Sequence, residues 1–202
     1  MDPKSSLPDL MTLLIGIGKV IPSIIMLMQL CVMLIGVYMT ISGLIELWGS
    51  QTPNVNKFLS RTESYSLTTG VVQLFLGGLF LSLGTLEFVG VLSRSLTGDY
   101  AAVRMTAESL SYTPGASVSA QEKAKAVTLA LLALLQAVGF VGITKSLLTI
   151  NRHVKQTGGG ATIGNALAWG IGGVLAWNFK WFSDVINNTI GFDFISLFTS
   201  LK

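Results

Sequence analysis

Four long apolar stretches constrain this chain more than any other feature of its sequence. They cover residues 23–48, 67–92, 126–150 and 162–182, and each carries a single charged residue, near one end. A helix needs about 20 mostly apolar residues to cross the ~30 Å hydrocarbon core of a membrane. We therefore predict an all-α integral membrane protein whose four transmembrane helices form two hairpins.

The charge content excludes most other classes of protein. Charged residues make up 11% of the chain, whereas soluble proteins carry about 25%. The net charge of +3 comes from Lys and Arg residues at the edges of the apolar stretches, where membrane proteins usually carry them. The composition therefore argues against a soluble globular or disordered chain. The lack of a basic stripe argues against direct, sequence-specific nucleic-acid binding.

Five segments follow from this pattern. They are an N-terminal interfacial segment (1–22), a first transmembrane hairpin (23–92), a polar connector (93–125), a second transmembrane hairpin (126–182) and a C-terminal amphipathic segment (183–202). Pro22 favours a helix that begins directly after it. Residues 10–19 are too few to span, so we expect an interfacial or re-entrant helix there. A short helix is expected over 99–110, and Ile186 and Ile190 belong to a helical apolar spacing that breaks near Gly191.

Basic residues suggest an orientation. Five of them flank the two short hairpin loops: Lys57, Arg61, Lys145, Arg152 and Lys155. The opposite side carries more basic residues in total but is much longer. Basic density therefore favours hairpin tips in the cytoplasm and both termini outside. We treat Arg152, His153 and Lys155 as the basic link of the second hairpin.

Small residues mark candidate helix-packing faces, since they let helix backbones approach closely. In the first hairpin they recur every seven residues, at Gly36 and Gly43 and then at Gly70, Gly77 and Gly84. In the second hairpin the candidates are Gly142, Gly164, Ala168, Gly172 and Ala176. Every helix thus carries a small-residue seam, which favours packing between copies in an oligomer over packing within one bundle alone.

The charges inside the apolar stretches could form ion pairs. Glu46 and Lys145 approach the hairpin-tip side, and Glu87 and Lys180 approach the other side. The alternative is that all four side chains snorkel to the lipid headgroups. Three glutamines lie within predicted helices, where they would hydrogen-bond to other helices or line a solute path: Gln29, Gln73 and Gln136.

No residue pattern predicts catalysis. Cys31 and His153 are the only residues of their kinds, which rules out an internal disulfide and a cysteine-based metal site. Gly158 to Gly164 resembles a phosphate-binding loop but lacks its Gly-Lys-Ser/Thr ending, so a flexible link is the better interpretation. We expect no enzyme activity, no cofactor and no metal.

The two hairpins could be a diverged repeat. The words Leu76-Gly77-Gly78-Leu79-Phe80 and Ile171-Gly172-Gly173-Val174-Leu175 occupy comparable places in the second and fourth stretches. Chance similarity between glycine-rich membrane helices is the alternative. Because two helices separate the halves, any repeat would be parallel in topology.

The second hairpin carries a resemblance to a known group. Its words are Phe140-Val141-Gly142-Ile143, Leu148-Thr149-Ile150-Asn151-Arg152, Thr162-Ile163-Gly164-Asn165-Ala166 and the run from Gly172 to Phe179. These resemble the small polytopic inner-membrane proteins of type IVB secretion, the IcmC/DotE family and the related IcmD/DotP proteins, and TraQ-like proteins of IncI-type conjugation. The resemblance covers residues 126–182. The first hairpin matches only in size and hydropathy, and the connector does not match.

The resemblance implies a multi-pass protein of a bacterial inner membrane, within an apparatus that moves DNA or protein between cells. A helix hairpin with a basic link also resembles the pilins of type IV secretion. We therefore expect a pilin-like or channel-forming subunit that acts by oligomeric assembly. Its partners would be copies of itself, other subunits of the apparatus and membrane lipids, which could include bound phospholipid. The alternative is a stand-alone membrane channel or transporter, and a lipid-modifying enzyme is a third hypothesis.

Overall fold

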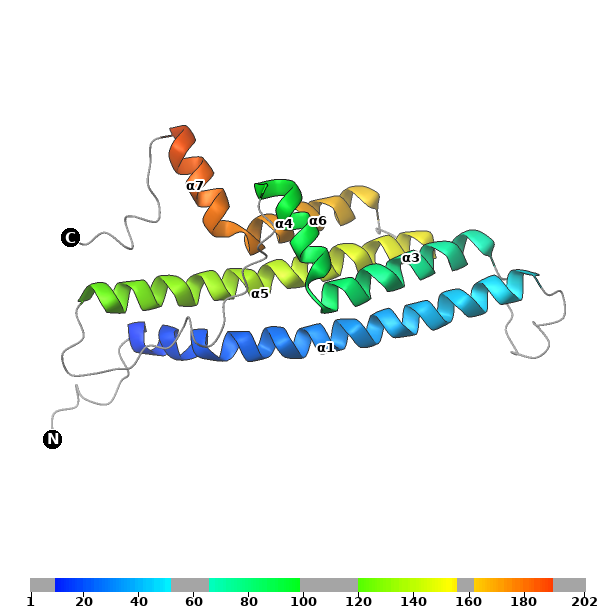
Figure 1. The fold of residues 1–202 in the computed structure, drawn as a ribbon, viewed down its shortest axis with the longest axis horizontal. Coiled ribbons are helices and arrows are strands. Elements are labelled where there is room, and N and C mark those ends of the chain that lie inside the picture. The colour runs from blue at the N-terminus through cyan, green and yellow to red at the C-terminus, as the bar shows by residue number, and fades with distance from the viewer. Residues whose placement is uncertain (1–9, 52–65, 99–119, 156–161, 191–202) are drawn as a thin grey trace. The chain divides into compact units, whose positions relative to one another are not determined.

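The computed structural model describes residues 10–51, 66–98, 120–155 and 162–190, and within them every regular element is a helix (Figure 1). The elements are α1 (Leu10–Gln51), α3 (Leu67–Gly84), α4 (Glu87–Thr97), α5 (Ala120–Val154), α6 (Ile163–Trp177) and α7 (Phe179–Ile190). Three of them, α1, α3 and α5, are long and apolar enough to cross a membrane. The all-α membrane class is confirmed, whereas four spanning helices are not.

Helix α1 begins earlier than the sequence suggests. It is one helix of 42 residues with Pro22 in its interior, where we expected a helix start. Proline removes one backbone donor and usually kinks or ends a helix in water, but helices in apolar surroundings tolerate it. The expected N-terminal interfacial helix is therefore the first part of α1. At 1.5 Å per residue, the whole helix measures about 63 Å, twice the hydrocarbon thickness.

The second apolar stretch is divided into two helices. Helix α3 ends at Gly84, and Leu86 takes a left-handed conformation with φ 67° before α4 begins. The final turn closes through hydrogen bonds from Thr85 N–H to Leu81 O and from Leu86 N–H to Leu83 O. A left-handed leucine costs roughly 1–2 kcal/mol and persists only where its surroundings hold it. The buried residues Val89 and Gly90 follow in the first turn of α4.

The fourth apolar stretch is also divided. Helix α6 has 15 residues, about 22 Å of helix, which is shorter than the hydrocarbon core. After a turn at Asn178, α7 starts at Phe179, four residues before the expected amphipathic segment. The break predicted near Gly191 and the helix predicted over 99–110 lie outside the described residues.

The chain divides into two compact units. The first comprises Met1–Met26, Val103–Phe140 and Leu175–Lys202, and the second comprises Leu27–Ala102 and Val141–Val174. In the first unit, α1 approaches α5 where Gly18 meets Ala130. The rings of Phe140 and Trp177 lie 6.4 Å apart in the same unit.

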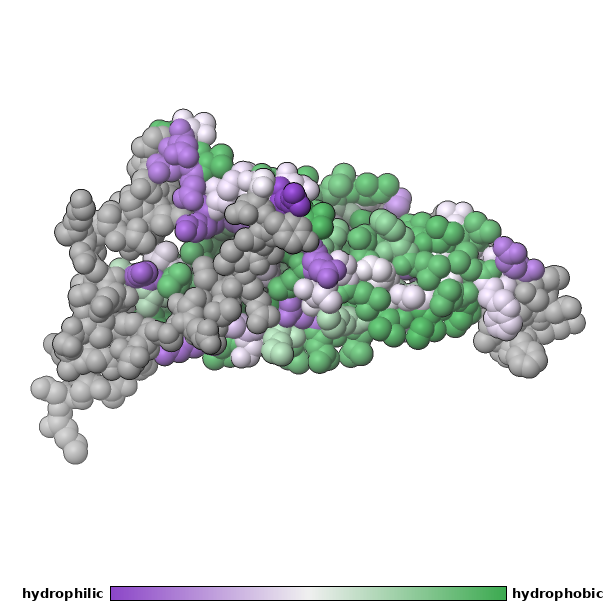
Figure 2. Space-filling view, viewed as in Figure 1, coloured by the Kyte–Doolittle hydropathy of each residue, from purple (hydrophilic) through white to green (hydrophobic). Residues whose placement is uncertain are grey.

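In the second unit, α1 and α3 form an antiparallel pair, and α5 and α6 form another (Figure 1). Large apolar side chains of α1 face outward, among them Leu34 at 62% and Tyr38 at 68% exposure. Figure 2 shows hydrophobic side chains over most of the visible α1 and α3 surface between their ends. A surface of this kind suits lipid rather than water.

Candidate functional site

The closest packing in the second unit is between α1 and α3. A Cβ atom built on Gly36 would lie 2.9 Å from the backbone nitrogen of Leu81, and one built on Gly43 would lie 2.9 Å from that of Leu74. Side-chain atoms do not approach backbone this closely, so both positions need glycine. The two α1 glycines therefore bring the α3 backbone into contact.

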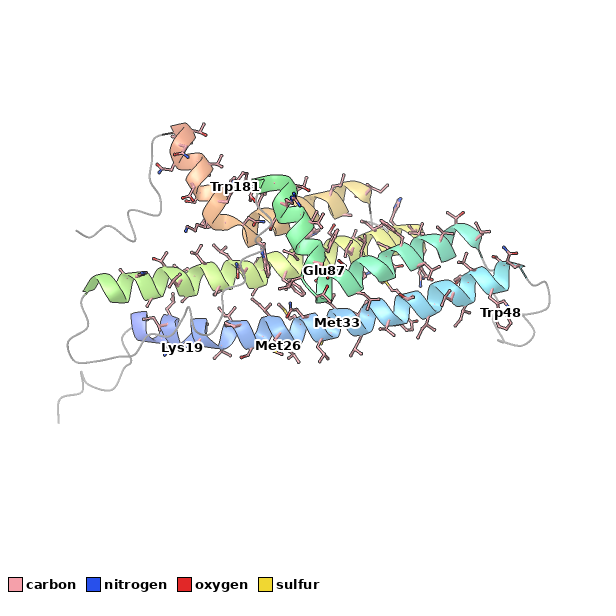
Figure 3. The ribbon with its side chains drawn as sticks, viewed as in Figure 1. Lys19, Met26, Met33, Trp48, Glu87 and Trp181 are labelled. Carbon is pink, nitrogen blue, oxygen red and sulfur yellow. The ribbon has the colours of Figure 1, made fainter. Side chains whose placement is uncertain are left out.

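The α3 glycines serve α1 in the same way. A Cβ on Gly77 would meet the side chain of Thr40 and lie 2.9 Å from its backbone nitrogen. Gly70 receives Leu47, and Gly84 receives Met33, which Figure 3 labels on α1. Each helix thus supplies glycines to the other.

The glycine contacts follow one register along the whole pair. Gly36 meets Gly77, and Gly43, seven residues further along α1, meets Gly70, seven residues back along α3. The buried positions of α3 are 70, 73, 76, 77, 80, 83 and 84, and they include the series 70, 73, 77, 80 and 84. Alternate steps of three and four residues keep one stripe facing a partner helix, as in a coiled coil. The α1/α3 contact, which we call the glycine seam, is therefore a continuous interface.

Two polar groups lie within or at the end of this seam. Ser42 Oγ donates to Gln73 Oε1 at 3.2 Å, and Gln73 is 1% exposed. The Nε2 atom of Gln73 is buried without a hydrogen-bond partner. At the α3 end, the Glu46 carboxylate accepts a hydrogen bond of 3.4 Å from the Ser66 backbone N–H. A carboxylate near a helix N-terminus is favoured by the helix dipole.

The α5/α6 pair meets at a single close crossing. A Cβ on Gly142 would lie 2.9 Å from the Cα atom of Gly173. Beside it, Ser146 Oγ donates a buried hydrogen bond of 2.6 Å to the Ala166 carbonyl, and Gly170 makes room for the same serine. Sequence reasoning identified Gly142 but missed the α6 side, whose Ala166, Gly170 and Gly173 alternate in steps of four and three residues.

The α6 residues that we expected to pack lie elsewhere on that helix. Gly164, Ala168 and Gly172 are exposed, and a Cβ on Gly172 would have nothing within 4 Å. Ala176 is half-buried. Within the described chain, this second face of α6 is therefore open, and α5 uses the first.

The candidate ion pairs are placed only in part. In the second unit, Lys145 Nζ lies 3.6 Å from the ring centroid of Trp169 in a cation–π contact, while Glu46 accepts the Ser66 N–H. Glu87, labelled in Figure 3 at the start of α4, and Lys180 on α7 belong to different units. Both pairings stay predictions.

The basic link occupies the end of α5. Arg152 and His153 are exposed in its last turn, and half-buried Lys155 follows it. Cations at this end complement the helix dipole. The glycines 158–160 lie outside the described residues.

The repeat hypothesis meets a difference between its two glycine words. In the first word, Gly77 packs and Gly78 has nothing within 4 Å. In the second word, Gly172 is open and Gly173 packs against Gly142. The glycines at matched positions of the two words therefore differ in their packing. An alignment of the two words shifted by one residue would match the packed glycine of each.

The remaining polar candidates are buried. Gln29, Gln73 and Gln136 are each less than a tenth exposed, and Gln73 uses its oxygen within the glycine seam. Over the described ranges, no group of three His, Cys, Asp or Glu side chains could hold a metal ion. Of the three glutamines, Gln73 joins two helices through its hydrogen bond with Ser42.

Comparison with known proteins identifies no relative of this chain. No protein-family model, curated protein or solved structure matches the chain. The functional assignment therefore depends on the sequence words and on helix packing.

Proposed function

We propose that this chain is a structural membrane subunit that acts by assembling with copies of itself, in a type IVB secretion or conjugation apparatus of a bacterial inner membrane. The carrying observation is the open face of α6. The five seam glycines of α1 and α3 (Gly36, Gly43, Gly70, Gly77 and Gly84) are used inside the chain, whereas Gly164, Ala168 and Gly172 remain exposed.

The surroundings of this face support the proposal. The large side chains that flank it are also outward, with Leu167 at 58% and Ile171 at 61% exposure. Small residues between larger apolar ones let a second helix approach in a membrane. In addition, α6 is too short to span alone, and oligomerisation is one way in which membranes accommodate short helices.

The resemblance of residues 126–182 supplies the second part of the proposal. It points to secretion or conjugation rather than to an isolated assembly. A pilin-like or channel-forming role is the form of assembly that the resemblance favours.

Imaging of the protein extracted in mild detergent tests the assembly. We expect a closed ring or helical tube for the wild type. Gly172→Leu should dissociate it, because the substitution fills the proposed contact between copies. Gly78→Leu is the matched control, since both glycines have open space within the chain. A wild-type monomer, or equal behaviour of the two variants, would contradict the proposal.

Deletion of the coding sequence in its host tests the apparatus. Transfer of DNA or protein between cells should stop while growth stays normal. Normal transfer from a clean deletion would remove this part of the proposal. Solute flux through a purified monomer in liposomes would instead favour a stand-alone channel.

A further inference from the structure

The glycine seam of α1 and α3 is compatible with more than one register. Glycines recur every seven residues on both helices. The larger residues of the opposite helix that pack on these glycines recur at the same spacing. On α1 these are Met33, Thr40 and Leu47, and on α3 they are Leu74 and Leu81, with the exposed Leu67 seven residues before Leu74. Because a coiled-coil face repeats after seven residues, sliding α3 by seven places the seam on an equivalent set of residues.

One such slide preserves the glycine contacts. If α3 moved seven residues towards the N-terminus of α1, Gly77 would leave Thr40 and meet Met33. By the same step Gly70 would meet Thr40, Gly36 would meet Leu74 and Gly43 would meet Leu67. Each glycine would again face a larger side chain. In lipid, no hydrophobic driving force between helices favours one of these arrangements over the other.

The pair Ser42–Gln73 distinguishes the two registers. In the structure the Ser42 hydroxyl donates to Gln73 Oε1 at 3.2 Å, and Gln73 is 1% exposed. After the slide, Gln73 would lie opposite Ile35, whose side chain can neither donate nor accept. We infer that the Ser42–Gln73 hydrogen bond selects the register of the α1/α3 pair, while the glycines supply only its closeness.

The geometry of Gln73 fits a role in selecting the register of the α1/α3 pair better than a role in stabilising the fold. Its Nε2 atom is buried with no hydrogen-bond partner, so the side chain is only partly satisfied. Replacing both partners of such a bond by apolar groups of similar shape is often neutral or stabilising. A single polar residue in a helix seam that specifies register and reduces stability is known from coiled coils.

Two pairs of spin labels read the register directly. Every variant carries Cys31→Ser, since Cys31 is exposed and would also react. One label pair occupies Leu27 and Val71, and the other Trp48 and Phe75, all of which are exposed. A slide of seven residues moves α3 by about 10 Å along α1. It shortens the first distance and lengthens the second, whereas separation of the helices lengthens both.

Three variants give the comparison. Ser42→Ala with Gln73→Leu removes the polar pair, and we expect a second population displaced by about 10 Å, with thermal stability equal to wild type or higher. Ile35→Ser with Ser42→Ala keeps Gln73 but moves its partner by seven residues, so the displaced distances should dominate. Ser50→Ala is the control, because the Ser50 hydroxyl donates to Leu47 O of its own helix.

The outcomes separate cleanly. Opposite changes of the two distances, absent from wild type and from Ser50→Ala, support the inference. Unchanged distances in both polar-pair variants would overturn it, and so would lengthening of both distances. The measurement uses the whole chain and does not depend on the secretion assignment.

Discussion

The two helix pairs of the second unit use small residues differently. Along α1 and α3, five glycines at seven-residue spacing form the contact between the helices. Each lies close to the backbone or a side chain of the opposite helix. Between α5 and α6, only the crossing of Gly142 with Gly173 is equally close, and a hydrogen bond from Ser146 accompanies it.

The difference shows that the spacing of small residues matters more than their number. Seven residues return to almost the same side of a helix, so the α1/α3 contact continues. Four residues overshoot one turn by about 40°, so the row Gly164, Ala168 and Gly172 turns around α6. Helix α5 takes another stripe, and the row faces outward.

The largest effect should come from filling the glycine seam. Gly77→Leu forces a side chain against Thr40 and should destabilise the protein by about 3 kcal/mol or more. Gly78→Leu, one residue along, has open space and should change little. Detergent unfolding followed by circular dichroism measures both. Equal losses would show that the seam is not as close as the structure has it.

A smaller loss is expected at the α5/α6 crossing. Gly142→Ala places a methyl 2.9 Å from the Gly173 Cα atom and should cost about 1–3 kcal/mol. Gly78→Ala in open space should instead stabilise α3 by about 0.5–1 kcal/mol, since alanine loses less backbone entropy in a helix. The same unfolding measurement applies. If Gly142→Ala were stabilising as well, α5 and α6 would cross less closely at Gly142 than the structure shows.

Removing the buried hydroxyl of the α5/α6 pair should cost less again. Ser146→Ala loses the 2.6 Å hydrogen bond to the Ala166 carbonyl, and the expected loss is about 1 kcal/mol. Thr149→Ala is the control, because Thr149 bonds to Lys145 O of its own helix. A loss for Thr149→Ala as large as that for Ser146→Ala would assign the effect to α5 alone.

The smallest effect belongs to the cation–π contact. Lys145 is exposed, and its Nζ lies 3.6 Å from the Trp169 ring centroid, which is worth about 0.5–1 kcal/mol at an exposed site. A double-mutant cycle with Lys145→Met and Trp169→Leu isolates this energy. A coupling energy of zero would assign the stability of the α5/α6 pair to its other contacts, such as that of Gly142 with Gly173 and that of Ser146 with Ala166.

Much of the architecture is visible in the sequence, and some of it is not. The helical membrane class follows from apolar length, and the glycine spacing of the first hairpin is directly readable. The end of α3 is not readable, because its last residue, Gly84, belongs to the seven-residue packing series and the apolar pattern continues through Leu86. The passage of α1 through Pro22 is hidden for the opposite reason, since proline usually signals a boundary.

The sequence by itself determined that the chain is helical and suited to a membrane, because apolar composition and length are properties of each segment alone. Only the tertiary structure decided which glycine of Gly172-Gly173 meets α5, and which row of α6 stays open. It also decided that Gln73 meets Ser42. These choices depend on the register and direction of a neighbouring helix, and a seven-residue repeat leaves that register open until a polar contact between the two helices selects it.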